Sequence, residues 1–258
     1  MKKSILVLIS LCLLTLTGCN LKKVIIYTAE DLAGKKIGVQ KGTTGEEYAK
    51  NKVNSAIVTS YKTILDATED LKKGDIEAIV IDEYPAIQVI KDNPNLMIIR
   101  DKMFEENKEK YAIAVKKGNT ELLNSINETI KELQQNGKYD GLIKTFMIPD
   151  GITEIPEITP ASANKVLKLG TNAMFPPFEY IQGKDVVGFD ISLGEYIAQK
   201  NNARLQIVDM NFAALLQALK SGTIDFAAAA ISITDERKNE VDFSVPYFSS
   251  EQVIIIRK

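Results

Sequence analysis

Short apolar stretches alternate with helical patterns in the first part of the chain. The predicted strands are 36–40, 56–60, 77–81 and 96–100, and the predicted helices between them are 46–52, 63–73 and 84–91. Gly74 directly follows the second helix, which is a common helix C-terminal signal. Alternation of this kind indicates an α/β unit with a largely parallel sheet.

The middle of the chain has a different pattern. A strand is predicted at 111–116, and residues 120–146 then carry apolar side chains at helical spacing, with Gly137 dividing the run into two helices. Residues 148–164 lack periodicity and hold three of the eight prolines. We expect this stretch to be an exposed, semi-extended linker.

A second α/β unit begins at residue 165. Its predicted strands are 166–171, 205–208, 224–229 and 253–257, and its predicted helices are 189–200 and 212–221. The segments 71–78 and 219–226 both show a helix end, a Gly C-cap and a buried strand, so the two units echo one another. Asp82 and Ser232 follow these strands, and α/β sheets bind ligands outside the carboxyl ends of their strands. We therefore expect an α/β fold of two lobes with a ligand cleft between them.

The N-terminus has the features of an export signal. A short basic head precedes an apolar run at 5–16, and Leu16-Thr17-Gly18-Cys19 follows. This pattern predicts a lipoprotein signal peptide at 1–18 that is cleaved before Cys19, whose thiol carries the lipid. The alternative is a cleaved signal peptide with an incidental cysteine. We expect a lipid-anchored protein on the extracellular or periplasmic face of the cell membrane.

Composition excludes several classes of function. The sequence contains no histidine and, apart from Cys12 in the predicted signal peptide, a single cysteine, so a zinc site of the usual type, a disulfide framework and a histidine general base are not expected. The formal net charge is −2, without a basic block, so nucleic acid is not an expected partner. We expect no metal, no cofactor and a monomer.

The stretch 227–244 (AAAAISITDERKNEVDFS) carries the most informative chemistry. A small apolar strand leads to a helix start at Thr234, and Arg237 lies in the first turn. A cation is unusual there because the helix dipole favours anions, but an arginine beside hydroxyls and free N–H groups suits a carboxylate ligand. The alternative is a surface arginine that pairs with Glu236 or Glu240.

Four motifs together resemble bacterial extracellular solute-binding proteins, above all the polar amino-acid-binding group that serves ABC importers. They are GTNAMFPPFEY (170–180), VGFDISLGEYIA (187–198), AISITDERKNEVDFS (230–244) and KIGVQKGTTGEEYAK (36–50). The resemblance implies a two-lobed fold of the periplasmic-binding-protein type II, with a hinge and an interlobe cleft. It also implies capture of a polar amino acid and delivery to an ABC transporter permease.

The order of these motifs differs from that of the family, in which the FPPFEY and SITDERK motifs precede GVQKGTTG. The chain therefore resembles a circularly permuted member, with the proline-rich linker joining the usual ends. The alternative is a gene-model artefact cut from two tandem copies. The expected units are a signal peptide at 1–18, a lipid-anchored tether at 19–28, lobe 2 at 29–112, a hinge strand with helices that pack on lobe 1 at 113–147, a linker at 148–164 and lobe 1 at 165–258.

The resemblance also assigns ligand contacts to positions in this sequence. Arg237 and Ser232 would hold the α-carboxylate, the Ala230 carbonyl would face the ammonium group, and Thr43 and Thr44 would close on the carboxylate from lobe 2. The remaining matches are Asp82 for the ammonium, Phe175 and Phe212 for stacking on the side chain, and Asn172 and Gln40 for side-chain selection. Phe178 is expected in the core.

Several of these assignments have structural alternatives. Thr44 with Glu47 fits a helix capping box, and Asp82 fits a helix cap. Asn172 weakly disfavours a cationic ligand, whereas Lys41 could serve an acidic one. The alternatives to transport are a ligand-sensing module and, on the same fold, an enzyme that resembles cyclohexadienyl dehydratases. We expect no enzyme, since the cleft lacks a histidine.

Overall fold

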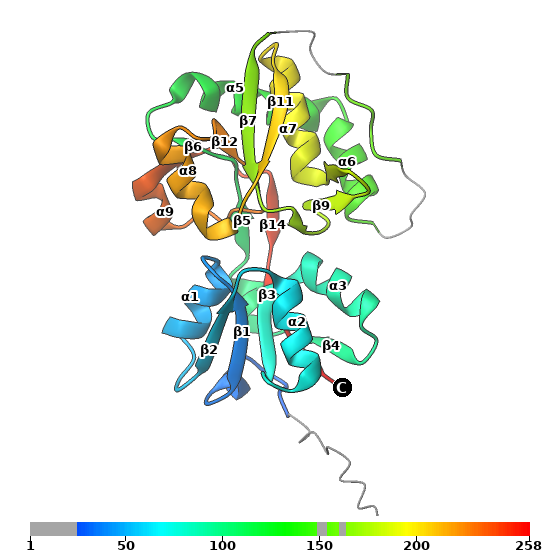
Figure 1. Cartoon of the computed structure of the whole chain (residues 1–258), viewed down its shortest axis with the longest axis vertical. Coiled ribbons are helices and arrows are strands. Elements are labelled where there is room, and N and C mark those ends of the chain that lie inside the picture. The colour runs from blue at the N-terminus through cyan, green and yellow to red at the C-terminus, as the bar shows by residue number, and fades with distance from the viewer. Residues whose placement is uncertain (1–24, 149–153, 160–163) are drawn as a thin grey trace, which may run out of the picture.

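The computed structural model describes residues 25–148, 154–159 and 164–258. Two α/β lobes lie one above the other, and the chain passes between them on β5 (Glu109–Tyr111) and β14 (Phe248–Ser250), as Figure 1 shows. These two strands pair antiparallel and place Tyr111 opposite Phe248. The predicted two-lobed α/β fold is confirmed.

Lobe 2 is built on a five-stranded sheet with the order β2-β1-β3-β15-β4. Its strands are β1 (Lys36–Gln40), β2 (Ile57–Tyr61), β3 (Ala78–Asp82), β4 (Leu96–Ile99) and β15 (Gln252–Arg257). Its helices are the short η1 (Glu30–Leu32), α1 (Thr44–Asn51), α2 (Ile64–Lys73), α3 (Glu83–Asp92) and α4 (Lys102–Glu106). The first three strands run parallel, and β15 runs antiparallel to both of its neighbours.

The position of β15 corrects the predicted boundary of lobe 1 at 165–258. This strand lies between β3 and β4 in the lobe 2 sheet, and its residues Val253, Ile254 and Ile255 are fully buried there. The chain thus returns to lobe 2 through β14, before its last strand. The apolar pattern of the strand was read correctly, but strand period alone does not say which sheet a strand joins.

Lobe 1 is built on a second five-stranded sheet with the order β11-β7-β12-β6-β13. Its strands are β6 (Ala114–Lys116), β7 (Val166–Thr171), β11 (Arg204–Asp209), β12 (Phe226–Ala227) and β13 (Val241–Phe243). The small sheet beside it holds β8 (Met174–Phe175), β9 (Glu179–Gln182) and β10 (Asp185–Val187). The helices are α5 (Thr120–Gln135), α6 (Lys138–Phe146), α7 (Phe189–Lys200), α8 (Leu215–Ser221), which the short η2 (Phe212–Ala214) precedes, and α9 (Asp235–Glu240).

The similar sequence segments 71–78 and 219–226 have the same structure, a helix end followed by a turn into a strand. Gly74 closes α2 and Gly222 closes α8, and both adopt left-handed backbone angles, with φ of 89° and 74°. A residue without a Cβ takes this conformation at little cost, which frees the chain to turn into a buried strand. Each of those strands ends at the face where the lobes meet.

The predicted strand at 111–116 is divided in the structure. Tyr111 ends β5, and Ala114 begins β6 in lobe 1, so the crossover lies between two short strands. Likewise, the predicted strand at 224–229 is regular only over β12, because residues 228–230 leave the sheet toward the cleft.

Aromatic side chains pack around the crossover. Phe178 is fully buried and contacts Tyr111, Phe248 and Phe189 edge to face, with ring centroids 5.2–6.4 Å apart. Tyr84 from lobe 2 meets the same ring at 6.2 Å. Such pairs add about 0.5–1.5 kcal/mol each beyond area burial, so this cluster stiffens the hinge. The prediction that Phe178 is a core residue is thereby correct.

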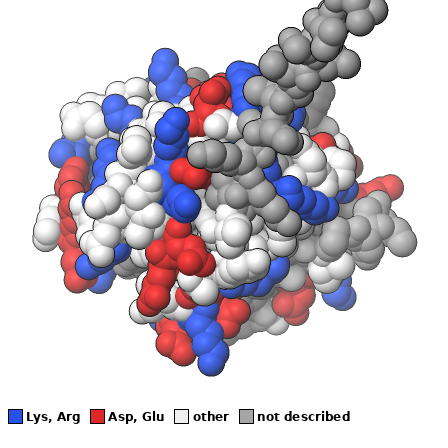
Figure 2. Space-filling model, turned by 90° about the horizontal axis from the view of Figure 1, so that it is seen from below, with Lys and Arg blue, Asp and Glu red and all other residues white. Residues whose placement is uncertain are grey.

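The N-terminal predictions fall mostly outside the described residues, which include neither the signal peptide at 1–18 nor Cys19. The described end of the predicted tether at 19–28 is not a free tether, since Ile26 is 1% exposed and packs in the lobe 2 core with Leu32 and Phe104. In the described part of the chain, no helix is long and apolar enough to cross a membrane. Figure 2 shows acidic and basic side chains interspersed over the lobe 2 face that points away from the cleft.

Candidate functional site

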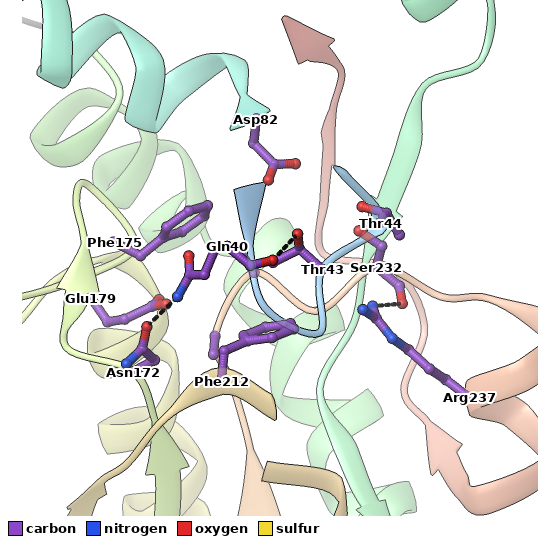
Figure 3. Close-up of a pocket in the computed structure, with 12 residues that line it drawn as sticks. Gln40, Thr43, Thr44, Asp82, Asn172, Phe175, Glu179, Phe212, Ser232 and Arg237 are labelled. Atoms are coloured by element: carbon purple, nitrogen blue, oxygen red, sulfur yellow. Dashed lines mark hydrogen bonds between the residues drawn. The ribbon is translucent and has the colours of Figure 1, made fainter. Parts of the chain in front are cut away.

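A pocket lies between the lobes, where the strand ends of both sheets meet (Figure 3). All ten residues predicted to contact a ligand line it. They are Gln40, Thr43, Thr44, Asp82, Asn172, Phe175, Phe212, Ala230, Ser232 and Arg237, and the sequence analysis missed two further lining residues, Ala229 and Glu179. The free space is about 10 Å³, enough for about one water molecule. Side chains from the two lobes therefore nearly fill the site.

Arg237 reaches the pocket from α9 in lobe 1. Thr234 caps this helix, and its Oγ1 accepts a hydrogen bond from the Arg237 N–H at 3.2 Å. The guanidinium donates to the Ser232 carbonyl at 2.7 Å and, across the cleft, to the Gly42 carbonyl at 2.9 Å. Burial lowers the pKa of Arg237, and the nearby charges of Glu109 and Asp82 offset part of this effect. The alternative of a surface arginine paired with Glu236 or Glu240 is not what the structure shows.

Phe212 covers the other face of Arg237. Its ring centroid lies 5.5 Å from the guanidinium carbon, within cation–π range. Phe175 enters the pocket from β8 on the opposite side and is 6% exposed. The two rings thus bound the pocket from lobe 1, as their assignment to the ligand side chain requires.

Asp82 ends β3 in lobe 2 and stands at the N-cap position of α3, but its side chain makes no capping bond. The carboxylate instead accepts hydrogen bonds from the Tyr111 hydroxyl at 2.5 Å and from Gln252 Nε2 at 3.0 Å. Burial and the nearby charge of Glu109 raise the pKa of Asp82 to about 7. The helix-cap alternative is therefore wrong, and Asp82 is held as a pocket residue.

The loop from Gln40 to Thr44 brings lobe 2 against lobe 1. Thr43 caps α1 by accepting from the Glu46 N–H at 3.3 Å, so the helix is capped one residue before the predicted Thr44. Gly42 has a φ of 84°, and a Cβ there would lie 3.0 Å from the Ala213 side chain of lobe 1. Glycine is thus required both for this turn and for the close approach of the two lobes.

A second direct contact between lobes joins the two residues assigned to side-chain selection. Gln40 Nε2 donates to Asn172 Oδ1 at 2.8 Å (Figure 3), and Asn172 Nδ2 donates to the Met210 carbonyl at 2.9 Å. Both side chains are buried, at 4% and 5% exposure. Lys41, by contrast, does not line the pocket, which removes the basis for an acidic ligand there.

Glu179, which the sequence analysis missed, is fully buried and lines the pocket from β9. Neither of its carboxyl oxygens accepts a hydrogen bond from a donor in the described part of the chain. Burial, followed by the charge of the adjacent Asp190, raises the pKa of Glu179 well above its usual range, because both disfavour the charged form. Its place in the FPPFEY motif was the available signal, but the sequence analysis assigned it no role.

Glu109 was also missed. It lies on β5 at the crossover, where its Oε2 accepts hydrogen bonds from Thr44 Oγ1 at 2.9 Å and from the Ser232 hydroxyl. Its Oε1 accepts from Gln252 Nε2 at 3.1 Å. No motif marks this residue, since it precedes the predicted strand in a run of charged side chains.

The pocket is lined by polar groups of several kinds. One guanidinium, three hydroxyls and several amides and carbonyls face carboxyl groups from both lobes. Among the described residues, no group of three or more His, Cys, Asp and Glu side chains is arranged to hold a metal ion. The arrangement suits a small molecule that has both a negative and a positive end.

Comparison with known proteins bears on this site. Residues 167–258, which contain Arg237 and seven other residues that line the pocket, match a described protein family. It is the family of bacterial extracellular solute-binding proteins, family 3. The resemblance drawn from the motifs is confirmed for this part of the chain.

Individual relatives are similar over part of their length. The arginine-binding extracellular protein ArtP of Bacillus subtilis (strain 168) is 39% identical over 97 residues, which are 38% of each chain. The L-cystine-binding protein TcyJ of Escherichia coli (strain K12) is 33% identical over 125 residues, 48% of this chain and 46% of that protein. The arginine-bound form of domain 1 from TmArgBP is 40% identical in sequence, covers 41% of this chain and 87% of its own, and has a TM-score of 0.33. The match thus spans less than half the length of either curated relative.

Proposed function

We propose that this protein captures a polar amino acid between its two lobes and delivers it to the permease of an ABC transporter. The observation that carries the proposal is the convergence of Arg237 from lobe 1 and Asp82 from lobe 2 on one pocket. An α-amino acid presents a carboxylate and an ammonium group on the same carbon, and these two side chains complement them. The family match of residues 167–258 supports the same function.

The proposed binding mode follows from the position of each group. Arg237 and Ser232 hold the α-carboxylate, with the hydroxyls and N–H groups of Thr43 and Thr44 closing on it from lobe 2. Each charge-assisted hydrogen bond is worth roughly 1.5–3 kcal/mol. The Asp82 carboxylate and the Ala230 carbonyl receive the ammonium group. Phe175 and Phe212 cover the ligand's side chain beside Gln40 and Asn172.

Binding requires the lobes to part and close again. The remaining space of about 10 Å³ is too small for an amino acid, and two hydrogen bonds cross the cleft directly, Arg237 to Gly42 and Gln40 to Asn172. In the proposed cycle these contacts open at the hinge, the ligand binds to lobe 1, and the lobe 2 donors close over it. Closure is favoured because the ligand adds contacts that exist only between closed lobes.

The charges near the site favour neutral or cationic ligands over acidic ones. Asp82 lines the pocket, and the adjoining groove next to Arg237 is lined by Glu46, Glu47, Glu236 and Glu240 against Lys50. Such a mouth attracts cations and repels anions. The names of the similar proteins ArtP and TcyJ point to arginine and cystine, which both fit this balance.

The lipid anchor on Cys19, the signal peptide at 1–18, the monomeric state and the permuted order are parts of the same proposal. The order of elements supports permutation, because the GVQKGTTG lobe precedes the family segment and the chain re-enters lobe 2 through β14 to add β15. A sensory output and a dehydratase-like reaction are the alternatives. The curated relatives described above are named as binding proteins, which favours binding without catalysis.

A thermal-shift panel of the twenty amino acids tests the proposal, followed by calorimetry on each hit. A ligand at a hundred times its Kd stabilises the folded protein by about 2.7 kcal/mol, which raises Tm by several degrees. A flat panel from folded protein would contradict amino-acid binding. Uptake reconstituted with the permease of the proposed ABC transporter separates transport from sensing. Product analysis of a bound hit tests for catalysis.

A further inference from the structure

The carboxylate of Glu109 sits among the groups that the proposed function assigns to the ligand's carboxylate. Its Oε2 accepts from Thr44 Oγ1 at 2.9 Å and from the Ser232 hydroxyl, which come from lobe 2 and lobe 1. Its charge also makes the largest electrostatic contribution that opposes the burial-induced fall in the pKa of Arg237. Glu109 thus accepts from two of the four residues proposed to hold the ligand's α-carboxylate.

We propose that Glu109 is a built-in substitute for the ligand's carboxylate, which bridges the two lobes and which an amino acid must displace in order to bind. This inference rests on the proposed function, because it assigns a competitor for the same donors. In this role Glu109 lowers the affinity for ligands that carry a carboxylate and so discriminates among ligands. The carboxylates of Glu109 and of the ligand repel one another.

The position of Glu109 fits this role. It lies on the crossover strand β5, which is bridged to Ser232 through Tyr111, so Glu109 stays beside Ser232 while Thr44 moves with lobe 2. A carboxylate at this point can accept from both hydroxyls only when the lobes are closed. Gln252, from the other lobe 2 segment near the crossover, donates to the second oxygen at 3.1 Å and orients the group.

A second cavity beside the pocket can receive the Glu109 side chain when the ligand displaces it. The side chain is half-buried and lies on the border of a second cavity, which the pocket residue Thr44 also lines. Lys52, Asn54 and Asn107 line that cavity and supply cationic and amide donors for a carboxylate. Displacement therefore moves the charge toward Lys52 and two amides, in a cavity that Glu30, Asp101 and apolar side chains also line.

A carboxylate that stays close to the site should cost a ligand affinity in proportion to the ligand's own negative charge. Two like charges within a few ångströms repel one another, and the loss of two hydrogen bonds to Glu109 must be offset by the new bonds to the ligand. An amine that lacks the α-carboxylate avoids both effects. The comparison between an amino acid and its decarboxylated analogue thus isolates the role of Glu109.

The test is calorimetry on wild type and Glu109→Gln, with an amino acid that raises Tm in the panel and with the amine lacking its carboxylate. The pairs are arginine with agmatine and cystine with cystamine. We expect Glu109→Gln to bind the amino acid about tenfold more tightly and the amine about equally. Glu106→Gln, an exposed charge on α4, controls for the loss of one negative charge.

Equal or weaker binding of the amino acid by Glu109→Gln would overturn the inference, because it would make Glu109 a neutral or supporting residue.

If wild type binds no amino acid, the proposed function fails first. The bridge itself is then still tested by X-ray scattering without ligand, where we expect a larger radius of gyration for Glu109→Gln than for wild type. An unchanged radius would refute it. Glu109→Asp, which shortens the side chain by one methylene, serves both measurements if Glu109→Gln does not fold.

Discussion

Asp190 holds Ala230 in an unusual backbone conformation. Its Oδ2 accepts a hydrogen bond from the Ala230 N–H at 2.8 Å and another from the Tyr247 hydroxyl at 2.7 Å. Ala230 has a φ of 48°, in the left-handed region that residues with a Cβ rarely adopt. Such strain costs about 1–3 kcal/mol and persists only where the surroundings enforce it. Here a buried carboxylate of α7 sets the direction of a carbonyl at the pocket wall.

Asp190→Ala is therefore expected to weaken amino-acid binding about tenfold or more without touching the ligand. Without the carboxylate, the Ala230 N–H loses its acceptor and the backbone can relax, which turns the carbonyl proposed for the ammonium group. Calorimetry with the panel hit measures the loss. Gln199→Ala, an exposed change on the same helix, is the control. Unchanged affinity in Asp190→Ala would show that the Ala230 conformation does not matter for binding.

Arg237→Ala should abolish most amino-acid binding, by about a hundredfold or more, because it removes two charge-assisted bonds to the carboxylate. The variant also releases the direct contact with the Gly42 carbonyl, so closure weakens too. Lys238→Ala removes a neighbouring exposed cation that pairs with Asp235, and should leave the Kd unchanged. Comparable Kd values for Arg237→Ala and wild type would show that the carboxylate binds elsewhere.

Asn172→Asp should shift selectivity toward cationic side chains. The new carboxylate keeps an acceptor for Gln40 Nε2 but loses the donor to the Met210 carbonyl, so its charge is free to attract a cation. We expect the ratio of arginine to glutamine affinity to rise about tenfold, as measured by calorimetry with both ligands. A ratio that stays constant would place the ligand's side chain away from Asn172.

The buried carboxyl groups predict a fall in stability as pH rises toward neutrality. The folded-state pKa values of Asp82 and Asp190 are each raised to about 7, mainly by burial, whereas an unfolded aspartate has a pKa of about 3.9. Between these values the folded protein holds more protons than the unfolded chain, so the free energy of unfolding decreases with rising pH. The lowered pKa of Asp242 acts in the opposite direction, but only below about pH 4.

Thermal unfolding at pH 5 and pH 8 measures this effect, and Tm should be several degrees higher at pH 5. In Asp190→Asn the difference should shrink, because one of the carboxyl groups with a raised pKa is gone. A Tm that increases from pH 5 to pH 8 would be inconsistent with raised pKa values at both sites. The same ionisation of Asp82 should strengthen the binding of an ammonium group between pH 6 and pH 8.

Much of the pocket could be predicted from the sequence because its residues lie in local motifs. Arg237 stands three residues after its cap, Asp82 ends a strand and Thr43 caps a helix, so local patterns place each at a sheet edge. Glu109 and Glu179 could not be predicted, because their roles depend on tertiary contacts. Glu109 contacts Ser232 and Thr44, and Glu179 lies beside Asp190. The sheet that β15 joins could not be predicted for the same reason, since Ile254 and Ile255 would suit the core of either lobe.

The insertion of β15 between β3 and β4 also has a consequence for how the protein folds. Four strands of the lobe 2 sheet come from the first hundred residues, yet the strand that joins β3 to β4 is the last in the described chain. Until that strand is made, two strand edges rich in Ile and Val are unpaired, which invites association between nascent chains. Pairs so distant in sequence form slowly. Lobe 2 should therefore complete its sheet only after synthesis has passed lobe 1, and until then its unpaired strand edges are open to association with other chains.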